Sequence, residues 1–239
     1  MTPRTRTTSQ LVATLAALLL AAGACGSGSD SSGSADKGSS ASPSASDGTC
    51  AYADDTLVPA SKPVDKPPAT PTVSGDVKAT ITTNQGKIPV ILDATHAPCA
   101  VNSFVSLAAQ KYYDNSACSR VVSDSRGVGI LQCGDPTGTG NGGPGYTFKE
   151  EVTGKEQYAL GVIAMAKRND PASTGGQFFM MFADSTQAFP PEYTILGKVA
   201  NAAGLKVLQK AGTVAMTGKQ DGYDGEPGSP IVITKVTAG

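Results

Sequence analysis

A segment of 24 residues without one large hydrophobic side chain divides this chain. In residues 26–49, 15 positions are Ser or Gly, and such a segment cannot bury enough apolar surface to offset the entropy of ordering it. Residues 50–72 carry five prolines and little periodicity, which predicts an extended arm. From residue 73 to residue 239 the composition is globular, and about 165 residues suffice for one domain with one core.

The first 24 residues have the features of a signal peptide. Two arginines precede a twelve-residue apolar run and a small-residue Ala-Gly-Ala sequence, and the run is too short to span a bilayer. Cys25 follows directly, as in a bacterial lipobox, where the thiol is diacylated. We therefore expect a signal peptide (1–24), then a lipid-anchored Cys25 with a disordered linker (25–49), on the outer face of a bacterial cell membrane. The alternative is ordinary secretion with Cys25 as a spare thiol.

Four further cysteines predict disulfides. Cys50, Cys99, Cys118 and Cys133 are even in number, and an oxidising compartment favours two bridges among them. Three pairings are open, and we favour Cys99 with Cys118, which leaves Cys50 with Cys133. We predict no metal site, because no two cysteines have the C-x2–4-C spacing and His96 is the only histidine.

The sequence gives no support for nucleic-acid binding or for dinucleotide binding. The chain has 19 Lys+Arg against 20 Asp+Glu, so no basic excess predicts nucleic-acid binding. Residues 138–143 match the dinucleotide motif G-x-G-x-x-G, but Pro144-Gly145 follows immediately, so no helix starts there to face a pyrophosphate. We interpret this run as a surface loop with several turns of positive φ, and we expect no cofactor.

Periodicity predicts strands with two helices. Residues 77–82 alternate and residues 87–92 are apolar, which predicts a β-hairpin. An apolar stripe that begins at Val101 predicts a helix from Pro98 to near Tyr113. Seven or eight short strands with two helices indicate a β-barrel or sandwich. The other predicted strands are 120–122, 128–132, 159–166, 177–182, 194–199 and 231–236, and the second helix is 202–210.

Four ordered blocks of sequence resemble the cyclophilins, which are β-barrel peptidyl-prolyl isomerases. The similarity covers roughly residues 75–237. It implies a mainly β fold, a closed eight-stranded antiparallel barrel capped by two α-helices, which agrees with the strands and helices predicted above. The blocks are 130–146 (ILQCGDPTGTGNGGPGY), 160–166 (LGVIAMA), 175–179 (GGQFF) and 196–199 (LGKV).

The resemblance also implies which residues form the active site. Arg120 takes the place of the catalytic arginine, and Gln132 that of the glutamine that orients it. Rotation about an X-Pro amide makes the proline nitrogen pyramidal and basic, so a fixed, always protonated donor stabilises the twisted state without a base or a metal. The implied substrate-binding residues are Ile130, Ala166, Lys167, Gln177, Phe179, Phe189 and Tyr193.

The chain departs from the family pattern near the proline pocket. Gly129 stands where the pocket floor usually has Phe, and Ala188 stands where many members have Trp. Cys118-Ser119 replaces the usual Phe-His, and the turn between the two catalytic positions holds eleven residues. We therefore expect a shallower proline pocket, unless Val128 or the longer turn refills it, and weak binding of cyclosporin-type macrocycles.

Two functional hypotheses follow. In the first, the protein is a monomeric, lipid-anchored isomerase whose substrates are Pro-containing polypeptides and which assists the folding of exported or envelope proteins. In the second, the altered pocket has cost turnover, and the protein binds Pro-containing segments at the cell envelope. The presence of both Arg120 and Gln132 favours the first hypothesis.

Overall fold

A computed structural model describes residues 48–213, 216–217 and 224–239. The predicted signal peptide, the predicted lipidated Cys25 and the linker up to residue 47 lie outside the described residues. Within the described ranges, no helix has both the length and the apolar character that crossing a membrane requires.

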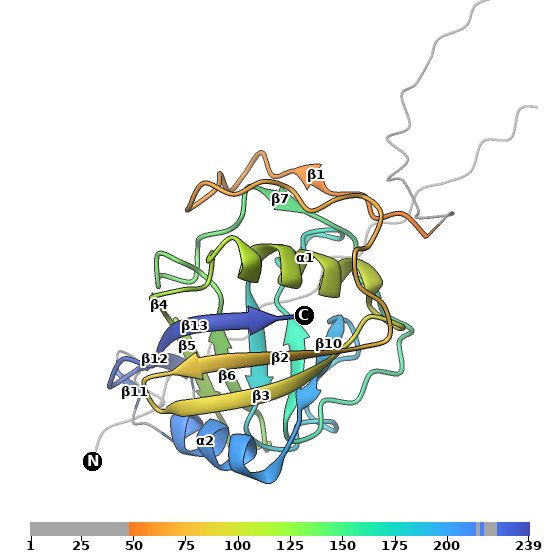
Figure 1. The fold of residues 1–239 in the computed structure, drawn as a ribbon. Helices are drawn as coiled ribbons and strands as arrows, with labels where there is room; N and C mark the ends of the chain where they lie inside the picture. The colour runs from red at the N-terminus through yellow and green to blue at the C-terminus, as the bar shows by residue number, and fades with distance from the viewer. Residues whose placement is uncertain (1–47, 214–215, 218–223) are drawn as a thin grey trace, which may run out of the picture. The chain divides into compact units, whose positions relative to one another are not determined.

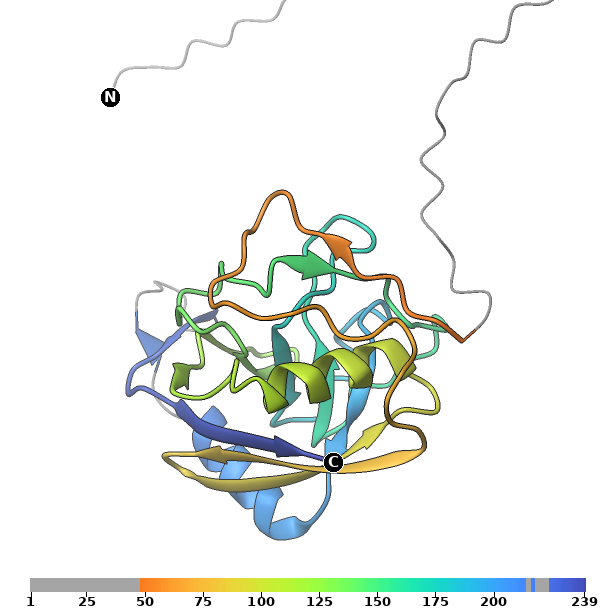
Figure 2. The same cartoon turned by 45° about the horizontal axis from the view of Figure 1, so that its top comes forward.

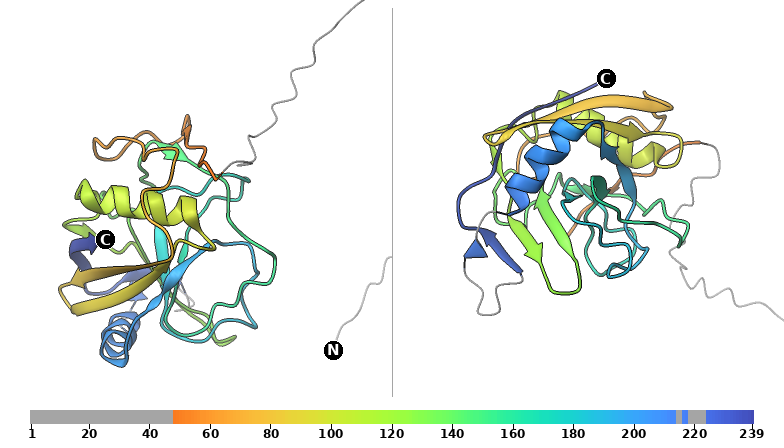
Figure 3. Two further views of the ribbon diagram at one scale, coloured as in Figure 1. Left: turned by 45° about the vertical axis from the view of Figure 1, so that its right-hand side comes forward. Right: turned by 90° about the horizontal axis from the view of Figure 1, so that it is seen from below.

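One antiparallel sheet forms the frame of the domain (Figure 1). Its eleven strands lie in the order β11-β12-β5-β6-β9-β8-β10-β3-β2-β13-β4, and the sheet is strongly curled (Figure 3). The strands are β2 (Asp76–Thr83), β3 (Gly86–Asp93), β4 (Ser116–Ala117), β5 (Arg120–Ser123), β6 (Gly129–Cys133), β8 (Val162–Met165), β9 (Phe178–Met181), β10 (Ile195–Val199), β11 (Met216–Thr217), β12 (Asp224–Pro227) and β13 (Val232–Ala238).

The edge strand β4 and the strand β5, which lies near the opposite edge of the sheet, are consecutive in sequence. β4 pairs with β13 and β5 pairs with β6, while only Cys118 and Ser119 separate β4 from β5. The Cys118 amide donates to the carbonyl of Ile231, and the Ser119 amide donates to that of Gln132. We predicted a closed eight-stranded barrel. The structure shows a mainly β fold with two helices and a curled sheet, whose ladder in the described residues runs from β11 to β4 without closing.

The predicted hairpin of β2 and β3 is confirmed, with Thr83 opposite Gly86 at its turn. Buried and less buried residues alternate along both strands, as expected where one face of a sheet covers a core. The Thr83 hydroxyl donates to the carbonyl of Gly86 and accepts from the amide of Gln85. Gly86 has a φ of 137°, a conformation that L side chains rarely adopt.

The two predicted helices are also present, α1 (Pro98–Ala109) and α2 (Ala202–Gly212). No side chain caps α1 at residue 97. Instead, the Glu151 carboxylate accepts hydrogen bonds from the amides of Cys99 and Ala100, which satisfies two free donors at a helix start. Asn201 caps α2 by accepting from the Gly204 amide at 2.8 Å. The helices lie across opposite ends of the curled sheet (Figure 1).

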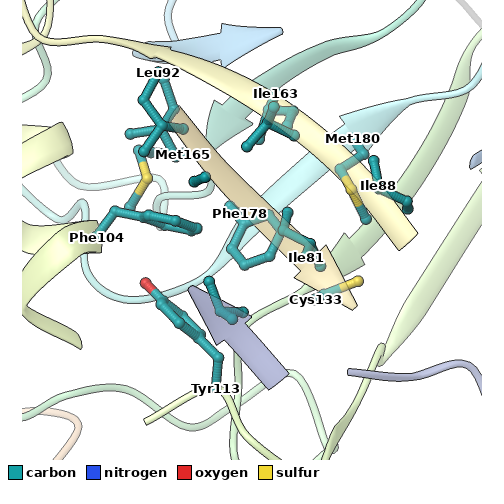
Figure 4. Packing of buried hydrophobic residues seen from close by; sticks show 14 of the residues in the cluster. Ile81, Ile88, Leu92, Phe104, Tyr113, Cys133, Ile163, Met165, Phe178 and Met180 are labelled. Atoms are coloured by element: carbon teal, nitrogen blue, oxygen red, sulfur yellow. The ribbon is translucent and has the colours of Figure 1, made fainter. Parts of the chain in front are cut away.

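Side chains alternate between the two faces of each strand, so the hydrophobic residues form two clusters, one on each face of the sheet. The inner cluster fills the curled sheet under α1, and Figure 4 shows Phe104 and Phe178 packed within it. The next residue, Phe179, points to the other face, so this pair divides between the two faces as period-two geometry requires. The outer cluster consists of Val122, Val128, Ile130, Tyr158, Ala164, Phe179 and Met181.

The proline-rich arm packs on α1 (Figure 2). Within it, β1 (Ala53–Asp54) pairs with β7 (Tyr146–Thr147). The buried Asn102 of α1 accepts from the amide of Thr72 and donates to the carbonyl of Pro68. The arm therefore forms part of the packed structure.

Two disulfides join the four cysteines, but the pairing that we favoured is wrong. Cys50 is bonded to Cys99, with 5.4 Å between their Cα atoms, and Cys118 to Cys133, with 4.0 Å. Cys118 precedes β5 and Cys133 ends β6, and because these strands are antiparallel neighbours the two residues lie side by side. The other bridge ties the start of the arm to the first turn of α1.

Candidate functional site

Four neighbouring strands bring the predicted site residues together. In the order β5-β6-β9-β8, Arg120 lies opposite Gln132, Gln132 opposite Phe179, and Phe179 opposite Ala164. Ala166 follows β8, and its amide donates to the carbonyl of Gln177. Residues up to about 60 positions apart in sequence therefore line one region of the sheet.

Aromatic rings form an apolar surface on the outer face of this region. The ring of Phe179 contacts those of Phe189 and Tyr193, with centroids 5.5 and 5.4 Å apart. Phe189 and Tyr193 contact each other at 5.0 Å, and Ile130 belongs to the same outer cluster. The structure thus assembles four of the predicted substrate-binding residues into one apolar group.

Tyr158 supports this group, and the sequence analysis missed it. Its side chain is buried, and its ring contacts Phe179, Phe189 and Tyr193. Its hydroxyl donates to the carbonyl of Tyr193 and accepts from the amide of the same residue, both at 2.9 Å. Nothing in the local sequence distinguishes Tyr158 from an ordinary core tyrosine, because both of its partners are backbone groups 35 positions away.

Gly129 occupies a place that excludes a side chain. A Cβ atom there would lie 2.6 Å from the Cβ of Ala183 and 3.0 Å from the ring of Phe182, which is too close for real atoms. Val128 is buried in the outer cluster with Ile130 and Phe179. A side chain at position 129 would therefore point toward Ala183 and Phe182, which pack in the inner cluster.

Arg120 is held by a carboxylate that the sequence did not single out. Its Nε and Nη2 atoms donate to the two carboxylate oxygens of Asp224, each at 2.8 Å. These hydrogen bonds raise the pKa of Arg120 above its usual value, against the opposing effect of burial. The charge of Arg120 also lowers the pKa of Tyr193, although burial and Glu192 raise it overall. The guanidinium therefore stays protonated, close to the aromatic group.

Gln132 belongs to a different hydrogen-bond network. Its side-chain amide donates to Gln177 at 2.9 Å, and the amide of Gln177 donates to the carbonyls of Gly140 and Gly142 at 2.9 and 2.8 Å. The two glutamines thus connect β6 to the glycine-rich loop. The orienting role of Gln132 toward Arg120 stays a prediction.

Asp135 organises the glycine-rich loop from inside. This fully buried carboxylate accepts hydrogen bonds from the amides of Thr137, Gly140 and Gly142 and from the hydroxyl of Thr137. Burial opposes its ionisation, but the hydrogen bonds outweigh burial and hold the pKa of Asp135 below its usual value. The loop has positive φ angles at Gly138 and Gly140 and leads into no helix, which confirms the interpretation of the G-x-G-x-x-G match.

A pocket of about 190 Å³ lies beside the aromatic group. Its walls include both glutamines of the network above and two side chains of the arm, Asp55 and Val58. Arg168, also in the wall, donates to Asp55 at 2.7 Å. The arm therefore contributes to a cavity that adjoins the predicted active site, which the composition of residues 50–72 gave no reason to expect.

Lys167 lies at the edge between this pocket and the aromatic group. Its Nζ atom is 5.3 Å from the centre of the Tyr193 ring and 3.9 Å from the Glu192 carboxylate. A cation over an aromatic face is attracted to the ring, so Lys167 contacts Tyr193, another of the predicted substrate-binding residues.

Relatives with known structures have this fold. A cyclophilin-type peptidyl-prolyl cis-trans isomerase from Cryptosporidium parvum matches 69% of this chain and 98% of its own, with a TM-score of 0.58 and 28% sequence identity. A second structure of that protein, in the presence of the dipeptide Ala-Pro, matches with a TM-score of 0.55 and 28% identity over 68% of this chain and 98% of its own.

Curated sequence relatives point the same way. The probable peptidyl-prolyl cis-trans isomerase B of Mycobacterium tuberculosis is 38% identical over 178 residues, which cover 70% of this chain and 56% of that protein. The protein of that name from Mycobacterium leprae is 38% identical over 188 residues, 73% of this chain and 61% of its own. The chain thus spans less than two thirds of the length of these relatives.

The family model described as "Cyclophilin type peptidyl-prolyl cis-trans isomerase/CLD" matches residues 78–238. This range contains the curled sheet except the first two residues of β2, both helices, Arg120 and the whole aromatic group, so the match includes every part of the candidate site except the arm. The chain belongs to the cyclophilin-type peptidyl-prolyl cis-trans isomerase family.

Proposed function

We propose that this protein catalyses the cis-trans isomerisation of X-Pro peptide bonds, with Arg120 as the catalytic residue. The observation that carries the proposal is a protonated guanidinium group fixed beside an apolar aromatic group. Such a site offers a cation to the peptide bond and an apolar surface to the proline ring. Family membership and the order of the site residues along the strands support the same assignment.

The mechanism needs only stabilisation of a twisted amide. Rotation about the X-Pro bond has a barrier of about 18–20 kcal/mol, because resonance is lost. In the twisted state the proline nitrogen becomes a better acceptor, so a donor held against it binds the transition state more tightly than the ground state. Arg120 would donate to this nitrogen and to the carbonyl oxygen of the substrate, since its planar group carries donors on more than one edge.

Substrate binding would divide between the aromatic group and the neighbouring pocket. The rings of Phe179, Phe189 and Tyr193 would contact the proline ring. The pocket beside it, between Gln132, Gln177 and the arm, would take part of the chain that precedes proline. This arrangement needs neither a cofactor nor a metal. It predicts a kcat/KM that is nearly constant between about pH 6 and pH 8, because no histidine belongs to the site.

We also propose that the protein works outside the cytoplasm, anchored by a lipid on Cys25, as a monomer that assists the folding of exported or envelope proteins. Two disulfides support an oxidising compartment, and the signal-like first 24 residues end at Cys25. A Cys25→Ser protein should be released from membranes, and mass spectrometry of the mature wild type should find the diacylglyceryl mass. A mature wild-type protein that starts at Cys25 without lipid would refute the anchor.

A second candidate function is binding without turnover. Two observations favour it: Gly129 has no room for a pocket-floor side chain, and Asp224 already occupies one edge of the Arg120 guanidinium. Exchange spectroscopy by NMR on an Ala-Pro peptide distinguishes the two candidates. An isomerase accelerates exchange between the cis and trans signals at catalytic concentration, whereas a binding module shifts the signals without accelerating exchange.

A further inference from the structure

We propose that Asp224 is a positioning residue for Arg120, which fixes one edge of the guanidinium group so that the other edge faces the substrate. The inference rests on the proposed isomerase function, because it assigns to Asp224 the orienting of the catalytic arginine. The juxtaposition was not expected from the sequence, where 104 positions separate the two residues.

Strand pairing places Asp224 on the same face of the sheet as Arg120. β12 pairs with β5 in antiparallel register, with Asp224 opposite Val122 and Gly225 opposite Val121. Side chains two positions apart share a face of a strand, so Arg120 and Val122 point to the same side of β5. Asp224 is thus the diagonal neighbour of Arg120, within reach of a long side chain. The register of β12 against β5 brings the carboxylate to the arginine.

The geometry of the contact leaves one edge of the guanidinium available. Both carboxylate oxygens are used, one by Nε and one by Nη2, each at 2.8 Å. This parallel two-bond arrangement fixes the plane of the group as well as its position. The remaining donors are on Nη1 and on the second hydrogen of Nη2. Those donors form a separate edge, which is suited to a substrate carbonyl and a proline nitrogen.

The arginine needs such a partner. Its side chain is 47% exposed, so packing alone does not hold it, and a long exposed side chain samples several rotamers. Gln132, its neighbour on β6, donates its amide to Gln177 in the network that reaches the glycine-rich loop. Asp224 therefore supplies the bidentate restraint that the structure shows on Arg120.

A carboxylate beside a cation has two opposing effects on catalysis. It orients the guanidinium, and it reduces the positive field that stabilises the transition state. The proposal commits to orientation as the larger effect, so removing the carboxylate must slow the reaction. Were the field more important, the same change would accelerate it.

The test compares Asp224→Asn and Asp224→Ser with Asp76→Asn. The control removes an exposed aspartate from β2, a strand that neighbours neither β5 nor β12, and leaves the Arg120 pair intact. In NMR exchange measurements with an Ala-Pro peptide, both Asp224 variants should lose about tenfold in kcat, with KM within about twofold of the wild type, while Asp76→Asn keeps the wild-type rate. The variants are compared after thermal unfolding has identified those that fold.

A second readout follows Arg120 directly and does not depend on turnover. In ¹H–¹⁵N spectra, the Nε–Hε signal of Arg120, assigned by its loss in Arg120→Lys, should be sharp and slowly exchanging in the wild type. It should shift and broaden in Asp224→Asn but not in Asp76→Asn. If the Asp224 variants are as fast as the wild type or faster, or if the signal is the same in wild type and Asp224→Asn, the proposal is overturned. A wild type without activity contradicts the isomerase function, and the signal alone then decides on the Asp224 contact.

Discussion

Replacing Asp135 by Asn tests whether one buried carboxylate maintains the glycine-rich loop. Asp135 Oδ2 accepts hydrogen bonds from the amides of Gly140 and Gly142, and Oδ1 accepts from the amide of Thr137. An Asn side chain has one oxygen and one NH₂ group. In either orientation the NH₂ group faces at least one backbone N–H, so donors oppose donors inside the protein.

The magnitude follows from the bonds that are lost. A hydrogen bond to a charged group contributes about 1.5–3 kcal/mol, and a buried donor left without a partner costs a similar amount. Water can reach part of the loop, where Thr137 and Thr139 are exposed, and relieves some of the cost. We therefore expect Asp135→Asn to lower the free energy of unfolding by about 2–4 kcal/mol at neutral pH. Chemical denaturation measures this value, with Asp170→Asn, an exposed aspartate, as the matched control.

The same experiment has a pH dependence with a defined sign. Hydrogen bonds hold the pKa of Asp135 below its usual value, against the effect of burial. The carboxylate therefore stabilises the folded state fully above the unfolded pKa of about 3.9, and this stabilisation is lost as the pH falls through the lower folded pKa. The difference between wild type and Asp135→Asn should thus shrink below about pH 4. A loss under about 0.5 kcal/mol at neutral pH would refute the assigned role.

Three further predictions concern the disulfide and the pocket. Replacing Cys118 and Cys133 together by Ala should lower the free energy of unfolding by about 3 kcal/mol, since a bridge spanning 15 positions restricts the unfolded chain; equal denaturation midpoints for variant and wild type would contradict this. Gly129→Ala should lower the free energy of unfolding by about 1–3 kcal/mol, because the new Cβ would lie 2.6 Å from that of Ala183. Thermal unfolding measures this loss, and an unchanged midpoint would show that the backbone adjusts freely. Cyclosporin-type macrocycles should bind weakly, because Ala188 and Gly129 each remove a contact worth about 1–3 kcal/mol; a nanomolar Kd by calorimetry would show that the pocket compensates.

The regular elements were predictable because their signals are local. The alternation along β2 and β3, the apolar stripe of α1 and the paired phenylalanines of β9 each report on which side chains face the core. The bounds shifted by a few residues, as in α1, which ends at Ala109 instead of near Tyr113. Strand neighbours and strand register are not local, and this is why the disulfide pairing was wrong.

The missed parts of the site depend on long-range pairing. β12 has the sequence Asp-Gly-Glu-Pro, all four residues of which are depleted in strands, and it forms because β5 offers a partner. Asp224 could be found only through that register. The packing of the arm on α1 was missed for a similar reason, since its contacts combine the Cys50–Cys99 bridge, the Tyr52 hydroxyl and backbone groups bound by Asn102, and these form no periodic pattern in the sequence of the arm.

The central claim is that Arg120 accelerates X-Pro isomerisation, and NMR exchange on an Ala-Pro peptide with wild type and Arg120→Ala tests it most directly. The wild type should accelerate the exchange of cis and trans signals at catalytic concentration. Loss of the cationic donor should lower kcat/KM by about 100-fold, or roughly 3 kcal/mol, while the Kd for the peptide changes much less. Arg120→Lys should not restore the rate, because a point charge cannot replace the planar group. If Arg120→Ala isomerised the peptide as fast as the wild type, the assignment of this residue and the mechanism built on it would be wrong.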